Sequence, residues 1–200
     1  MELLTVLKEK FKNSRFKLLK QNQKYGFDIV LLEPKKGVPY QLIFTVGLSN
    51  QAQNTSEKYS DFKYIELYFC LPEYWKINQN HWAIDYIDKL GQIPQKNNTW
   101  YGPGDTIPTA NPPTQISEKL LQSYFILSEP MLLKDQLKEV VLNDKTIRFL
   151  AIIPIFKVEF DYKMRNSAKV LIAKMQYKKI NEMLDEYRKP VARKRFLGLF

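Results

Sequence analysis

The chain contains one histidine, His81, and one cysteine, Cys70, which limits the chemistry that its side chains can perform. A zinc site of the Cys/His type needs several such ligands, so one cannot be assembled here. A Ser/His/Asp or Cys/His catalytic unit would need His81 as its base. Because His81 precedes Trp82 at the expected start of a helix, a surface or capping role is the ordinary interpretation. We therefore expect no catalytic residue, no metal ligand and no cofactor.

The carboxylates give no catalytic pair either, since acid–base hydrolysis needs two that converge on one site. Asp85 and Asp88 are three residues apart on an expected helix, and a solvated helix face explains both. Glu66 lies in the middle of an expected strand among aromatic residues. We expect Glu66 to be either exposed or paired with a cation from a neighbouring strand. A lone carboxylate supports no reaction, so the sequence predicts a protein that is not an enzyme.

One segment, Trp100 to Thr106, has the glycines of a ligand-binding loop. A phosphate-binding loop would end in Gly-Lys-Ser/Thr and lead into a helix, whereas Ile107-Pro108 follows here. A tight turn closed by Asp105 is the better interpretation. The surrounding residues 95–118 are expected to form a long loop, and such loops are usually functional or mobile.

This loop supplies the candidate partner-binding residues, which are Trp100, Tyr101, Asp105 and Thr106. Exposed Trp and Tyr side chains are the usual anchors of protein interfaces. The alternative is that Trp100 and Tyr101 fill a small satellite core beneath the loop.

The elements that must position these residues are visible as hydrophobic periodicities. The clearest is the strand that begins near Lys63, where apolar and other residues alternate up to Pro72. One face carries Ile65, Leu67, Phe69 and Leu71, and the other carries Tyr64, Glu66, Tyr68 and Cys70. Pro72 lacks the N–H that a strand ladder needs, so the strand should stop there. Cys70 is then a small buried side chain and not a reactive thiol.

The remaining periodicities predict an α+β fold: an antiparallel or mixed sheet with helices packed on it. A helix is expected over 82–90, capped by Gly91 with Pro94 beyond it. Another is expected from its N-cap Ser167 to about Tyr187, ended by Lys189-Pro190. The other expected elements are a helix over 2–12, a hairpin turn over 34–37, strands over 27–32, 40–48, 120–127 and 140–142, and a central buried strand over 146–155.

The net charge of +10 is concentrated at the ends of the sequence. Residues 1–24 carry +5 and residues 160–200 carry +7, which leaves −2 for the middle. Basic ends can attract nucleic acid, anionic lipid or an acidic protein, although solvated charged faces also explain them. No signal-peptide core and no apolar run of membrane-spanning length is present, so we expect a soluble, cytoplasmic protein without membrane insertion.

Several segments in register resemble the Suppressor-of-fused (SUFU) domain family. They are the Gly-Leu-Ser element within 45–49, the Glu-Leu…Leu-Pro…Trp strand within 66–75, the helix over 82–90, the Trp…Gly…Asp-Thr-Ile loop within 98–107 and the strand with a Glu-bearing turn over 147–159. The resemblance implies a SUFU-like domain over 25–190, preceded by an N-terminal basic helix (1–24) and followed by a basic-apolar tail (191–200). Asp105 stands where relatives often have His, and the tail matches nothing in the family.

The resemblance is greatest to single-domain bacterial members of the family. It implies a non-enzymatic immunity protein or antitoxin that binds a cognate protein toxin, often a nuclease, and neutralises it by occlusion. The alternative is a basic nucleic-acid-binding domain or a general protein-interaction module. Nucleic-acid binding is disfavoured, because the sequence has no recognition-helix motif and no strand that interleaves basic and aromatic residues. Oligomeric state cannot be predicted.

Overall fold

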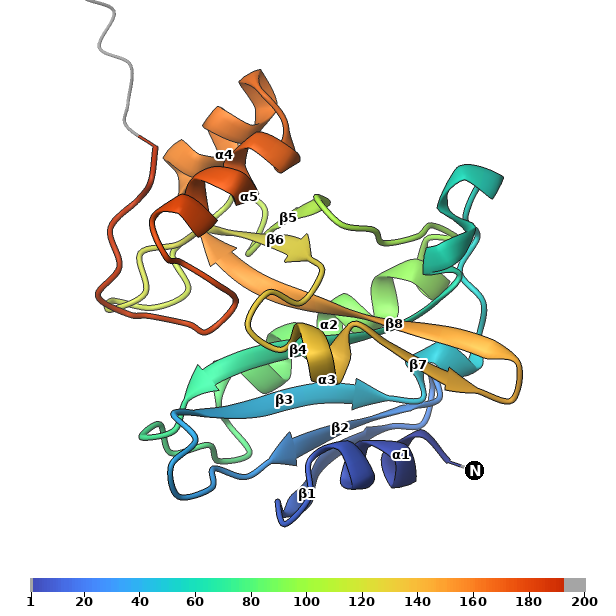
Figure 1. Cartoon of the computed structure of the whole chain (residues 1–200). Helices are drawn as coiled ribbons and strands as arrows, with labels where there is room; N and C mark the ends of the chain where they lie inside the picture. The colour runs from blue at the N-terminus through green and yellow to red at the C-terminus, as the bar shows by residue number, and fades with distance from the viewer. Residues whose placement is uncertain (1, 193–200) are drawn as a thin grey trace, which may run out of the picture.

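A single mixed sheet of eight strands dominates the computed structural model, which describes residues 2–192 (Figure 1). The strands are β1 (Phe16–Asn22), β2 (Phe27–Leu32), β3 (Tyr40–Val46), β4 (Tyr64–Pro72), β5 (Thr106–Pro108), β6 (Tyr124–Ser128), β7 (Glu139–Leu142) and β8 (Lys145–Ile155). Their order is β1-β2-β3-β4-β8-β6-β5, and β7 pairs with β8 beside this path. Only the β4–β8 pairing is parallel among the described strands. The predicted α+β class with a mixed sheet is confirmed.

Helices cover both faces of the sheet. They are α1 (Leu3–Lys10), α2 (Trp82–Lys96), α3 (Lys134–Leu137), α4 (Lys157–Arg165) and α5 (Ala168–Tyr177). Figure 1 shows α2 behind the sheet and α1 in front of it. Ile84 and Ile87 of α2 belong to the core on one face, whereas Leu7 of α1 and Met175 of α5 belong to the core on the other.

Strand β4 divides these two cores, as its alternation predicts. Ile65, Leu67, Phe69 and Leu71 pack on the α2 side. Tyr68 and Cys70 pack on the side of α1 and α5. Because both faces are covered, β4 is buried from Ile65 onward, and it ends at Pro72 as expected. The predicted central strand near 146–155 corresponds to β8, which pairs with β4, β6 and β7.

The predicted helix from Ser167 to Tyr187 is wrong in its second half. Ser167 does cap α5, since its hydroxyl accepts a hydrogen bond from the Val170 N–H at 3.2 Å. The helix nevertheless ends at Tyr177, and Lys179 adopts a φ of 58°. Residues 178–192 then run back along the sheet, where the Leu184 N–H donates to the Cys70 carbonyl at 2.9 Å. The sequence analysis also did not predict helix α4, which directly precedes α5.

Gly91 does not cap α2, contrary to the prediction, because the helix continues to Lys96 with Pro94 inside it. Gly91 instead allows a close approach: a Cβ at this position would lie 2.7 Å from Cζ of Phe27 on β2. The continuation also shortens the predicted 95–118 loop. Strand β1, which pairs antiparallel with β2, lies within the segment predicted as an N-terminal basic helix.

No helix among the described residues is both long enough and apolar enough to cross a membrane.

Candidate functional site

Three glutamates are almost completely buried: Glu66, Glu159 and Glu182, with at most 1% of each residue's surface exposed. Buried ionisable groups are costly unless they are hydrogen-bonded, and they often mark functional sites. Their partners therefore decide whether they can carry out chemistry or serve the fold.

Glu66 on β4 holds the turn that follows β3. Its Oε1 accepts hydrogen bonds from the N–H groups of Gly47 and Ser49, both at 3.0 Å, and from the Ser49 hydroxyl at 2.7 Å. The Thr45 hydroxyl lies 2.6 Å from the other oxygen. Both sequence-based expectations for Glu66 are wrong, because it is neither exposed nor paired with a cation. The turn wraps over the strand face and places backbone donors where we expected a basic side chain.

Burial raises the pKa of Glu66 from 4.5 to about 7, because the ionised form loses its hydration. The hydrogen bonds from Thr45, Ser49 and Gly47 act in the opposite direction and limit the rise.

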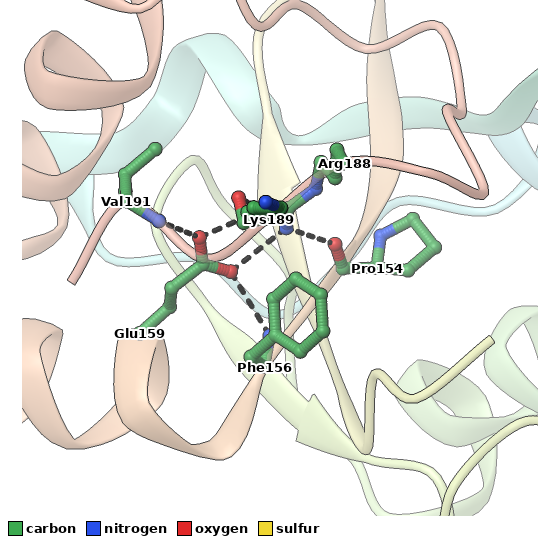
Figure 2. Close-up of polar contacts among 6 residues, drawn as sticks. All are labelled: Pro154, Phe156, Glu159, Arg188, Lys189 and Val191. Atoms are coloured by element: carbon green, nitrogen blue, oxygen red, sulfur yellow. Dashed lines mark hydrogen bonds and ion pairs between the residues drawn. The ribbon is translucent and has the colours of Figure 1, made fainter. Parts of the chain in front are cut away.

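Glu159 on α4 pairs with Arg188 of the returning segment, as Figure 2 shows. Both guanidinium Nη atoms donate to the carboxylate, each at 2.7 Å. The N–H groups of Phe156 and Val191 also donate to it, both at 2.9 Å. Arg188 further donates to the Pro154 carbonyl at 2.8 Å. This bidentate pair fastens residues 188–191 to the end of β8.

Glu182 of the same returning segment accepts hydrogen bonds from three consecutive backbone N–H groups before α3. Met131, Leu132 and Leu133 donate to it at 3.1, 2.8 and 2.9 Å. The Tyr68 hydroxyl donates to it as well, at 3.1 Å. Burial, together with the nearby Glu182 charge, raises the pKa of Tyr68 well above its ordinary value. The sequence analysis assigned no role to Glu159, Glu182 or Arg188; the only signal was the Glu-bearing turn after the late strand.

All three buried glutamates are therefore tethers that fix a turn or chain segment to the sheet. Residues 2–192 contain no group of three or more His, Cys, Asp or Glu side chains that could hold a metal ion. The lone histidine has the predicted capping role, since His81 Nδ1 accepts a hydrogen bond from the Ala83 N–H at 3.3 Å.

The expectation that Asp85 and Asp88 both lie on a solvated helix face is wrong for Asp88. Asp85 is exposed, but Asp88 is buried and does not belong to a solvated face. It pairs with Lys20 at 2.8 Å and accepts a hydrogen bond from Asn22 at 2.7 Å. Both partners come from β1, a strand the sequence analysis did not predict, so the pairing could not have been foreseen.

The predicted turn at Asp105 is present. Its carboxylate accepts a hydrogen bond from the Gly102 N–H at 2.8 Å, and Gly104 adopts a φ of 94°. Thr106, the first residue of β5, is half-buried, and its hydroxyl accepts a hydrogen bond from Lys163 of α4 at 3.3 Å.

Trp100 and Tyr101 differ in their surroundings. Trp100 is half-buried and lies against the Tyr59 ring, with 4.6 Å between ring centroids. It also covers Gly102, where a Cβ would meet the indole at 2.5 Å. Tyr101 is only 4% exposed and belongs to the core on the α2 side. The structure therefore favours the satellite-core alternative for Tyr101, whereas Trp100 keeps a partly open face.

The family model described as Suppressor of fused protein (SUFU) matches residues 23–189. No curated protein matches the chain.

Among solved structures, a SUFU homologue from Neisseria gonorrhoeae superposes with a TM-score of 0.73 at 15% identity, covering 96% of each chain. A chain of the Sufu-Fu complex gives a TM-score of 0.68 at 15% identity, covering 94% of this chain and 90% of that one. Suppressor of Fused from Drosophila gives 0.67 at 14% identity; the match covers 95% of this chain but only 50% of the Drosophila chain. At identities of 14–15%, the structural similarity establishes the fold alone.

Proposed function

This chain belongs to the suppressor of fused family, and from that premise we propose that it is a non-catalytic protein-binding domain that neutralises a cognate bacterial toxin. The proposal rests on the observation that the buried carboxylates serve the fold and form no reactive site. Glu66, Glu159 and Glu182, the groups best suited to chemistry by their burial, each hold backbone segments in place. Such an arrangement builds a rigid surface, which suits binding.

The mechanism in this proposal is occlusion of the toxin's active site, or docking beside it, in the cytoplasm. A stable interface of ordinary size would bury about 800 Å² on each partner. One solved relative was crystallised as the Sufu-Fu complex, which supports a binding role for this fold. The family resemblance implies a nuclease as the toxin, and because nuclease active sites are usually basic, the contact should avoid the basic surface of this chain.

The decisive experiment is co-expression of this chain with a toxin encoded by the neighbouring gene. We expect cells to survive and the two proteins to co-elute at a fixed stoichiometry. His81→Ala should protect equally well, because this side chain only caps α2. Survival without complex formation, or loss of protection in folded His81→Ala, would argue for an enzyme.

The predicted anchor Trp100 can be tested in the same system. Trp100→Ala should weaken toxin binding by more than about 2 kcal/mol, mainly through faster dissociation. Neutralising Arg193, Lys194 and Arg195, which lie outside the described residues, should mainly change the association rate, upward for a basic toxin because like-charge repulsion is lost, and added salt should remove that effect. If the tail variant loses most of the affinity and Trp100→Ala loses none, the basic tail is the binding surface.

Nucleic-acid binding is the second candidate, because residues 163–179 contain six cations and no carboxylate. Lys169, Lys178 and Lys179 are exposed, with Lys163, Arg165 and Lys174 nearby in the same segment. Phosphate contacts would make the affinity for random DNA or RNA fall steeply with salt. A titration at two salt concentrations distinguishes this candidate from the first.

A further inference from the structure

Two turns that are far apart in the sequence bring exposed tyrosines together at the end of β4. Tyr74 follows that strand and Tyr187 lies in the returning segment, with 64% and 81% of their surfaces exposed. The Tyr74 hydroxyl lies 3.4 Å from Oε1 of Glu186, which connects the two turns. Exposed tyrosines that gather in this way are typical of protein-binding surfaces.

Buried contacts hold the first turn rigidly. The side chain of Gln41, which is 2% exposed, donates to the carbonyls of Pro72 and Trp75 at 2.9 and 2.7 Å. The Glu73 N–H donates to the Pro39 carbonyl at 3.1 Å. The turn is therefore fixed before any partner arrives, which reduces the entropy lost on binding.

The second turn is held equally well. Met183 forms a parallel bridge with Cys70 at the end of β4, and Glu182 and Arg188 tether the residues on either side. Within the turn, the Tyr187 N–H donates to the Asp185 carboxylate at 2.8 Å. Both turns thus present their side chains from a fixed backbone.

The aromatic area extends from the first turn onto α2. The half-buried Trp75 ring lies 5.7 Å from His81 and 6.2 Å from Trp82, measured between centroids. Trp and Tyr are the residues that most often carry binding energy at protein interfaces.

The charge of these two turns is opposite to that of the whole chain. Residues 73–75 and 185–187 contain three carboxylates and no cation, although the net charge is +10. The flanking cations are Lys76 and Lys189, and Arg188 is turned inward to Glu159. A guanidinium group can stack on tyrosine and pair with a carboxylate at once, so this combination favours an arginine-rich contact.

We propose that Glu73, Tyr74, Trp75, Asp185, Glu186 and Tyr187 form a docking surface for a basic protein partner, and we call it the acidic aromatic surface. This inference rests on the proposed function and narrows it: the toxin would present arginine and lysine side chains to this end of the sheet. The surface is distinct from the predicted Trp100 loop, and the two are alternative anchors for the toxin: docking on this surface predicts that Trp100→Ala leaves toxin binding unchanged.

A groove elsewhere on the molecule is basic and not acidic, so it provides the control for the charge of the partner. It has a volume of about 730 Å³ and is lined by Met131 and Ile172, with Lys134, Lys138 and Lys169 around them. Its lysines would favour an acidic segment.

The test uses the purified full-length chain and a displayed library of random 12-residue peptides. We expect the selected peptides to be rich in Arg, Lys and aromatic residues. Their affinity should fall at least about tenfold in Tyr74→Ala/Tyr187→Ala and in Glu73→Gln/Asp185→Asn/Glu186→Gln. The second variant removes charge alone, since Asn can still accept the Tyr187 hydrogen bond. The matched control, Lys134→Gln/Lys138→Gln/Lys169→Gln, should bind within about twofold of wild type.

Enrichment of acidic peptides that depend on the three groove lysines would overturn the proposal in favour of the groove. Absence of any enrichment, or affinities unchanged in both surface variants, would also overturn it. Unaltered thermal unfolding of each variant serves as the folding control. The toxin co-expression experiment distinguishes failure of this docking surface from failure of the proposed function. If wild type protects the cells and the folded surface variants protect equally, this surface is wrong and the proposed function stands.

Discussion

Ser49 donates both its backbone N–H and its hydroxyl to the same oxygen of Glu66, at 3.0 and 2.7 Å. The serine ends the Gly-Leu-Ser element after β3, and the glutamate begins the Glu-Leu…Leu-Pro…Trp strand. Two of the sequence elements that resemble the family are therefore one structural unit. Gly47 completes it, because its N–H donates to the same carboxylate and its φ of 106° suits glycine.

This tether predicts a pH-dependent stability. The pKa of Glu66 is about 7 in the folded protein, whereas that of an ordinary exposed glutamate carboxyl is 4.5. Between these values the folded state keeps a proton that the unfolded state releases, so the contribution of Glu66 to stability falls as pH rises. The slope approaches about 1.4 kcal/mol per pH unit. We expect Glu66→Gln to remove this slope in urea unfolding between pH 5 and 8. A stability difference between the two proteins that stays constant with pH would contradict the assignment.

The Glu159–Arg188 pair should be costly to break. Arg188→Ala leaves a buried carboxylate without its charged partner, and we expect the free energy of unfolding to fall by about 3–5 kcal/mol. The control is the exposed Lys157–Asp161 pair, 2.6 Å apart on the same helix. Lys157→Ala should cost less than about 1 kcal/mol. Similar losses in chemical denaturation for the two variants would show that the Arg188 tether is not important.

Cys70 should react slowly with thiol reagents in the native protein, because it is 2% exposed and burial raises its pKa well above the ordinary value. Unfolding should restore rapid labelling. A Cys70→Ser/Ser56→Cys variant places the thiol at an exposed position and should label quickly in both states. Rapid labelling of native wild type would mean that β4 is not covered at this end.

Gly91→Ala should change the free energy of unfolding in the direction opposite to the usual one. Within a helix this change normally stabilises by about 1 kcal/mol. Here the new Cβ would meet the buried Phe27 ring at 2.7 Å, so we expect a net loss of about 1–3 kcal/mol. Introducing Phe27→Leu as well should recover part of it. A more stable Gly91→Ala protein in thermal unfolding would show that α2 and β2 can separate easily.

The sequence by itself determined the elements whose pattern is local. Alternation in β4 placed Ile65 and Tyr68 on opposite faces, and periodicity located α2, β2, β3 and β8. It also determined the turn at Asp105 and the family resemblance. These features depend on residues that are adjacent in the sequence and on which face of an element is buried. Both can be read from the pattern of consecutive residues.

Only the tertiary structure decided how distant segments meet. It paired β4 with β8 in parallel, ended α5 at Tyr177 and returned residues 178–192 along the sheet. That return gives Glu182 and Arg188 their partners and brings Glu186 to the Tyr74 hydroxyl. The physical reason is that a buried carboxylate is stabilised by whichever donors surround it in space. Those donors come from as far as 114 residues away, as the Tyr68 hydroxyl does for Glu182, and no local pattern encodes such contacts.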